Sequence, residues 1–128
     1  MIDKELTQIY DFSLELNKLK YTYRYKSTKC VEHDSTASHS WHIALLSMLY
    51  QKQLEIDVDM QKCMKLALIH DIAEILTDDI DNKLVRDHKV SIKEKNDNET
   101  MALKKLTTIL PQSLSDEISD LWIEYESN

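Results

Sequence analysis

Apolar residues recur at helical spacing from the start of the chain. From residue 2 to residue 20 they follow one another at intervals of three, four and seven, at Ile2, Leu6, Ile9, Leu16 and Leu19. Such intervals place these side chains on one face of a helix. The stretch that follows, up to Ser35, has no regular period, and we interpret it as a loop with a short turn.

Two further segments are more apolar and predict helices at the centre of the fold. Ser38 or Ser40 is a suitable N-cap for a helix that runs to about Leu54, and Asp59 is a suitable N-cap for a helix that reaches Ile75. Apolar residues cover most of the circumference of both segments, as is typical of helices buried on several sides. We therefore expect both helices to be buried.

The second half of the chain predicts two more helices. Residues 77–87 are polar and acidic, which indicates a loop or a short helical turn, and a helix over residues 91–109 ends before Pro111. Ser113 and Asp116 resemble a capping box at the start of a last helix. The pattern predicts one all-α domain over residues 1–128.

Composition removes several classes of protein. The chain has no glycine, which argues against a β-sandwich or barrel and excludes glycine-rich phosphate-binding loops. A net charge of −7 with scattered lysines argues against a nucleic-acid partner. Cys30 and Cys63 read as reduced thiols, and neither a membrane span nor a signal peptide is visible. We therefore expect a cytoplasmic protein without a membrane partner.

Polar residues in the two most apolar helices carry the candidate chemistry. His39 opens the second helix, and His70 and Asp71 follow an apolar stretch late in the third, where Glu74 shares their side of the helix. Asp79 lies just beyond. Buried charges are costly unless they are paired or bound to metal, and imidazole with carboxylate suits a divalent transition ion. Such an ion activates water and clamps phosphoryl oxygens.

Simpler interpretations exist for each residue alone. His-Asp doublets arise by chance, and a second one at His33-Asp34 reads as solvent-exposed loop. His39 alone could be a helix-start histidine satisfied by the backbone. The metal site is favoured by the combination of doublet, apolar setting, nearby acids and an upstream histidine.

These residues resemble the motifs of HD-domain phosphohydrolases. Residues 37–41 resemble the first metal-histidine motif, and residues 70–80 resemble the second, which reads His-Asp-x-x-Glu-x-x-Thr-Gly-Asp in the bacterial 5′-deoxynucleotidase branch and its eukaryotic relatives. Residues 19–25 resemble that branch's Leu-Lys-x-x-x-Arg-aromatic segment, and residues 121–126 its Leu-Trp-x-Glu-Tyr-Glu segment. The resemblance implies an HD-domain bundle of about five to six helices.

The same resemblance implies a metal-dependent phosphomonoesterase acting on deoxynucleoside 5′-monophosphates. It implies one divalent transition ion (Mn, Co, Zn, Fe or Ni) held by His39, His70 and Asp71. It further implies that Arg24 grips the phosphate and that Glu74 orients or deprotonates the attacking water. Asp79 would contact the sugar hydroxyl or assist the leaving oxygen, and Tyr25 would lie beside the base. An ordinary packing role for Tyr25 is an equal alternative.

Three departures from the motifs leave alternatives open. Asp78 replaces the family's glycine, Ser38 replaces an acid, and the chain stops at Asn128, before the helix that carries the family's fourth metal-ligand aspartate. The chain is then a fragment, or another group fills that position, or tight metal binding is lost. The alternative function is a non-catalytic or degenerate HD module with a regulatory or partner-binding role; a third is hydrolysis of another phosphate ester. A homodimer is also expected, from the apolar helices.

Overall fold

The protein is built from helices, described here by a computed structural model of residues 3–24, 34–77 and 91–127. The chain begins with α1 (Lys4–Leu16), which continues into the 3-10 helix η1 (Asn17–Tyr21). Next come α2 (Thr36–Leu54), α3 (Met60–Ile69) and the single turn α4 (Glu74–Thr77), followed by α6 (Ile92–Thr107) and α7 (Gln112–Glu126). The all-α prediction is confirmed for the residues that the structure describes.

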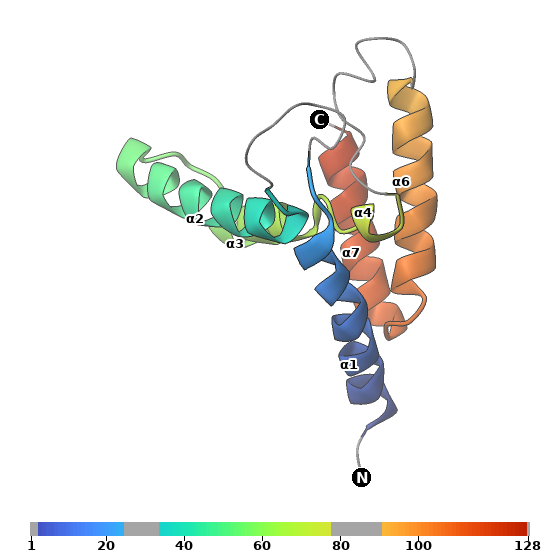
Figure 1. The fold of residues 1–128 in the computed structure, drawn as a ribbon. Coiled ribbons are helices and arrows are strands. Elements are labelled where there is room, and N and C mark those ends of the chain that lie inside the picture. Colours follow the sequence, from blue (N-terminus) through green and yellow to red (C-terminus); the bar gives the residue numbers. More distant parts are fainter. Residues whose placement is uncertain (1–2, 25–33, 78–90, 128) are drawn as a thin grey trace.

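The helices form a bundle from which one helical pair projects. In Figure 1, α6 and α7 run side by side and α1 runs in much the same direction, whereas α2 and α3 extend to one side as an antiparallel arm. The core lies in the bundle, where apolar side chains of α1, η1, α6 and α7 meet those of the turn before α4. It comprises Phe12, Leu19, Ile72, Ala73, Ala102, Leu103, Leu106, Leu110 and Trp122. Burial of each large side chain in this core stabilises the folded state by roughly 1.5–3 kcal/mol relative to leaving that side chain exposed.

The prediction that the two most apolar helices would be buried is wrong for these residues. Within α2 only Thr36, Ser40 and Ala44 are buried, and within α3 only Ala67. Trp41 is 64% exposed and Leu49 is 53% exposed. Apolar residues around the whole circumference of a helix show that the helix needs packing partners. They do not show that the described residues supply those partners. The arm therefore carries a broad apolar face, made by Trp41, Leu45, Met48, Leu49 and Leu68 among others.

Helix ends follow local side-chain chemistry, and two predicted caps are corrected. The cap of α2 is Ser35, whose side chain accepts from the Ser38 backbone N–H, so the helix starts earlier than predicted. Asp59 caps α3 as predicted, by accepting from the Lys62 N–H. The predicted capping box of the last helix is wrong, because α7 begins after Pro111 without a side-chain cap. The predicted fourth helix is confirmed as α6, with Ser91 as its cap.

The third helix is shorter than predicted, and this change shapes the site. Helix α3 ends at Ile69 with His70 as its C-cap, and residues 71–73 form turns before α4 begins at Glu74. His70, Asp71 and Glu74 therefore do not share one continuous helix. The first predicted helix is also divided, because it tightens into η1 after Leu16.

The end of α2 contains an unusual backbone conformation. Its C-cap, Glu55, has φ 53° and ψ 40°, in the left-handed region that normally favours glycine. The Glu55 N–H bonds back to carbonyls of Gln51 and Lys52, which ends the helix and turns the chain toward α3. Among the described helices, none is both long and apolar enough to cross a bilayer.

Candidate metal centre

His39 is placed by the start of α2. The Ser35 cap sets the first turn of the helix, and the His39 N–H bonds to the Ser35 carbonyl at 2.9 Å. An isolated antiparallel bridge between Tyr23 and Ser35 draws the segment after η1 against this helix start. The backbone bond from the Arg24 N–H to the Asp34 carbonyl, at 2.9 Å, continues the same contact. Arg24 and His39 are thereby brought together.

His70 and Asp71 are placed by the end of α3. The His70 Nδ1 lies 2.7 Å from the carbonyl of Ala67, one turn earlier, and it must donate because a carbonyl only accepts. In the neutral ring this bond leaves the lone pair on His70 Nε2, whereas in the charged ring Nε2–H donates to Asp71 Oδ2, which lies 3.0 Å away. Hydrogen bonding of one ring nitrogen to the backbone is the usual way in which proteins orient a metal-binding histidine.

His39, His70 and Asp71 converge as the sequence predicts. One ligand atom from each lies within 4.8 Å of the others, and His39 Nε2 is 3.8 Å from Asp71 Oδ2. Two ligands that are each about 2.1 Å from one ion lie about 3.0–3.5 Å apart, so His70 and Asp71 already have a suitable separation and His39 would have to move closer to Asp71. The side chains are 18%, 10% and 19% exposed, which leaves the cluster open to solvent on one side. Two imidazoles and a carboxylate are a donor set that fits a divalent transition ion.

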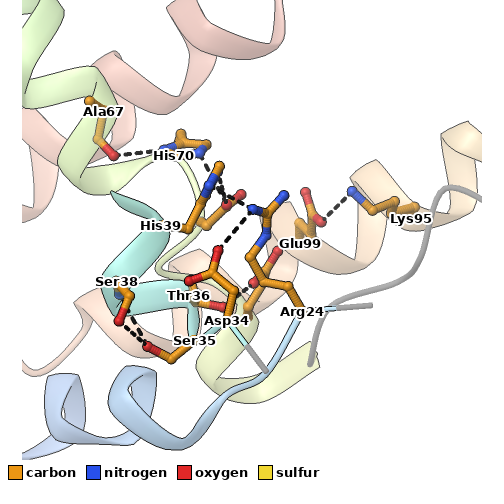
Figure 2. Close-up of polar contacts among 12 residues, drawn as sticks. Arg24, Asp34, Ser35, Thr36, Ser38, His39, Ala67, His70, Lys95 and Glu99 are labelled. Carbon is orange, nitrogen blue, oxygen red and sulfur yellow. Dashed lines mark hydrogen bonds and ion pairs between the residues drawn. The ribbon is translucent and has the colours of Figure 1, made fainter. Parts of the chain in front are cut away.

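Arg24 makes a close contact with this cluster (Figure 2). Its Nη1 lies 2.6 Å from His39 Nδ1 and 3.5 Å from Asp34 Oδ2. A guanidinium has only donors, so His39 Nδ1 accepts here and the proton of a neutral ring sits on Nε2. An ion held at Nε2 requires the opposite arrangement, with the proton on Nδ1. Arg24 would then have to release the ring, and its donors would become available to another acceptor.

All three cluster residues have shifted pKa values, and the shifts of the two histidines are in opposite directions. Burial lowers the pKa of His39, and the charge of Arg24 lowers it further. Burial also opposes the charged forms of His70 and Asp71, but their mutual contact outweighs it, so the pKa of His70 is raised and that of Asp71 is lowered. Asp71 is therefore ionised at neutral pH, as a ligand must be, whereas an ion must displace a proton from His70 at acidic pH.

Glu74 is held deep beside the cluster by a residue that the sequence motifs did not single out. Its side chain is 3% exposed, and Glu74 Oε2 accepts a 2.7 Å hydrogen bond from the Thr36 hydroxyl, which is fully buried. The negative charge of Glu74 also acts on His70. Thr36 is adjacent to the Ser35 cap, and nothing in its local sequence distinguishes it from an ordinary helix-start threonine.

Three further residues near the cluster also had no predicted role. Lys95 and Glu99 of α6 form an ion pair, which in sequence looks like any i,i+4 pair on a helix surface. Tyr125, which lies in the motif-like segment 121–126 without a predicted role, presents its ring to His70 at a centroid distance of 5.6 Å. Tyr25 and Asp79, both predicted site residues, lie outside the described residues, as does His33.

Together the fold and the three converging side chains define a class of protein. The HD domain model matches residues 16–128, and the chain belongs to the HD domain family.

Curated relatives give a more specific comparison than the family alone. The chain is 34% identical over 96 residues to the 5′-deoxynucleotidase HDDC2 of Xenopus laevis, covering 73% of this chain and 43% of the relative. It is 32% identical over 120 residues to the 5′-deoxynucleotidase YGK1 of Saccharomyces cerevisiae, covering 87% of this chain and 53% of the relative. The chain thus spans about half the length of the curated relatives it matches.

A solved structure shares the fold. A predicted metal-dependent phosphohydrolase from Magnetospirillum magnetotacticum superposes with a TM-score of 0.76 at 30% sequence identity, covering 98% of this chain and 62% of that one. A conserved hypothetical protein from Pyrococcus furiosus superposes with a TM-score of 0.71 at 25% sequence identity. That match covers 92% of this chain and 66% of the other chain. Membership of the family and an HD-type helical bundle are therefore shown.

Proposed function

We propose that this chain forms the metal-binding part of a phosphohydrolase that releases phosphate from deoxynucleoside 5′-monophosphates. The convergence of His39, His70 and Asp71 carries the proposal, since these side chains could hold one divalent ion. The names of the curated relatives supply the substrate class. The cytoplasm remains the predicted compartment.

Each residue has a distinct task in the proposed reaction. A divalent ion in such a site activates water and offsets the negative charge on phosphoryl oxygens. Glu74, held by Thr36, lies near the cluster and would accept the proton that leaves the attacking water. Arg24, once released from His39, would bind the phosphate through its fork of donors.

The bond changes balance without any further reactant. The water oxygen forms a bond to phosphorus, the bond between phosphorus and the 5′ oxygen breaks, and the products are phosphate and a deoxynucleoside. The departing oxygen takes up one proton, which balances the proton that Glu74 accepts from the attacking water. Asp79 is proposed to assist this oxygen or to contact the sugar hydroxyl, and Tyr25 to lie beside the base. Equal hydrolysis rates on ribo- and deoxynucleotides would count against the proposed contact of Asp79 with the sugar.

The experiment compares two histidines. His70→Ala should lose bound metal and reduce phosphate release from deoxynucleoside 5′-monophosphates to background, measured by elemental analysis and a phosphate assay with Mn²⁺ or Co²⁺ added. His42→Ala is the matched control, because His42 is exposed on α2 and outside the cluster. Phosphate release that persists in His70→Ala would refute the mechanism. A wild-type chain that binds no metal and turns over nothing would support the non-catalytic module instead.

A further inference from the structure

Lys95 and Glu99 form an ion pair on α6 that is more buried than helix stability requires. Lys95 Nζ lies 3.0 Å from Glu99 Oε1, and the two side chains are only 24% and 10% exposed. A solvent-exposed pair at this spacing already contributes about 0.3–0.5 kcal/mol. Burial adds a desolvation penalty that such a gain does not offset. A partly buried pair of this kind is better explained by a task at the neighbouring site.

The pair borders a small cavity that reaches the metal cluster. The cavity has a volume of about 230 Å³ and is lined by Asp71, Lys95, Asn96, Glu99, Tyr125 and Glu126. Asp71 belongs to both the cavity and the cluster. Pockets that enclose whole small molecules measure roughly 300–1,000 Å³, so this one suits a phosphate-sized group.

Charge makes Lys95 the decisive residue of this cavity. Of the six lining residues it is the only cation, whereas Asp71, Glu99 and Glu126 are acidic. The charges of Glu99, Glu74 and Asp71 together outweigh burial and raise the pKa of Lys95, which keeps it protonated. Without the charge of Lys95, the lining of this cavity would consist of three carboxylates and the neutral side chains of Asn96 and Tyr125, which would repel a phosphate.

The orientation of the pair matches this requirement. Figure 2 shows the Lys95 ammonium extending from α6 to the Glu99 carboxylate, on the side of the helix where Arg24 and the histidines are drawn. An ammonium has three donors, and one bond to Glu99 leaves two for another acceptor. Arg24 approaches the same cluster from the segment after η1, so two cations from different elements face one centre.

We propose that Lys95 is a second cationic substrate-binding residue, which donates to a phosphoryl oxygen of the substrate, and that Glu99 is the positioning residue that aims it. The inference rests on the proposed phosphohydrolase function for the identity of the substrate. The phosphate-binding part stands on the cavity and its charges alone, and it can be measured without turnover.

The experiment uses inorganic phosphate as the probe. Phosphate is titrated calorimetrically into the Mn²⁺-loaded full chain and into Lys95→Met, which keeps the apolar stem and removes the charge. Loss of one charge-assisted hydrogen bond should weaken phosphate binding roughly tenfold or more, with a matching rise in KM for the nucleotide and unchanged metal content. Lys93→Met is the matched control, because Lys93 is exposed two residues away on α6 and should bind phosphate as the wild type does.

Two further variants keep the test decisive if Lys95→Met folds poorly. Lys95→Arg should restore most of the phosphate affinity, and Glu99→Gln should weaken it by a smaller factor than Lys95→Met while raising KM more than it lowers kcat. Wild-type phosphate affinity in Lys95→Met, or no phosphate binding by the loaded wild type, overturns the inference. A wild type that binds phosphate but hydrolyses no deoxynucleotide refutes the proposed function and leaves the Lys95 assignment standing.

Discussion

Thr36 connects the start of α2 to the carboxylate that the proposed mechanism needs. Its hydroxyl donates to Glu74 at 2.7 Å, and both side chains are buried. A hydrogen bond to a buried charged group contributes more than a neutral one, about 1.5–3 kcal/mol. The bond also joins two segments that are far apart in sequence, so it fixes Glu74 relative to His39.

Removing this hydroxyl should affect both stability and activity. We expect Thr36→Val to lower the free energy of unfolding by about 1.5–3 kcal/mol and to reduce phosphate release, because Glu74 loses its fixed orientation. Thr107→Val is the control, since Thr107 is also buried but its hydroxyl bonds to backbone carbonyls of α6. Thr107→Val should lower the free energy of unfolding by about 1 kcal/mol and leave phosphate release unchanged. Urea unfolding and a phosphate assay measure both quantities, and full activity in Thr36→Val would contradict the role given to Glu74.

Among single residues, those with distinctive chemistry could be predicted from the sequence, whereas residues of types that are common on helices could not. His39, His70 and Asp71 were recognisable because such residues are rare in apolar helices, and the structure brings them together. Thr36 and Lys95 carry no such signal. A helix-start threonine and an i,i+4 lysine occur on most helices, and only the fold shows what they face.

Among the elements, the end of α3 is the most consequential departure from the sequence pattern. Apolar spacing continues to Ile75, so periodicity alone extends the helix through the doublet. The structure instead ends it at Ile69, and His70, the C-cap, bonds through its side chain to the carbonyl of Ala67 before turns follow. Periodicity reports which residues are buried, and a turn that keeps Ile72 and Ala73 in the core satisfies it equally well. Element types were therefore predictable, whereas this boundary was not.

The left-handed cap of α2 offers a test at the level of a single element. A residue with a β-carbon in this conformation costs roughly 1–2 kcal/mol, and glycine avoids most of that cost. We expect Glu55→Gly to raise the free energy of unfolding by up to about 1 kcal/mol after its extra chain entropy is deducted. Glu117→Gly, in the middle of α7, should instead lower it by about 1 kcal/mol. Thermal unfolding measures both, and a destabilised Glu55→Gly would show that the conformation carries no strain.

In the molecule as a whole, the core lies away from the most apolar helices. Among the described residues, six of the twelve buried apolar side chains lie on α1, α6 and α7 and only two on α2 and α3, which leave many of their own apolar side chains exposed. Sequence patterning identifies apolar faces but not which of them meet, because that depends on long-range packing. The family resemblance predicted the fold correctly where burial predicted from composition failed.

The exposed face of the arm is the natural contact for the predicted homodimer. Large apolar patches on a surface commonly mark interaction sites. We expect the chain to have the mass of a dimer by light scattering, and Leu49→Glu to shift it to a monomer. Leu14→Glu is the control, because Leu14 is 49% exposed on α1 and Leu49 is 53% exposed on α2. A monomeric wild type would remove the homodimer prediction.

The placement of the three converging side chains has a mechanical consequence. His39 lies near the start of α2, and His70 and Asp71 follow the last turn of α3, so the chain between them forms the whole arm. An ion bound to all three would close that loop like a removable crosslink. Since a ligand that binds only the native state raises stability with its free concentration, the melting temperature becomes a gauge of metal occupancy that requires no substrate.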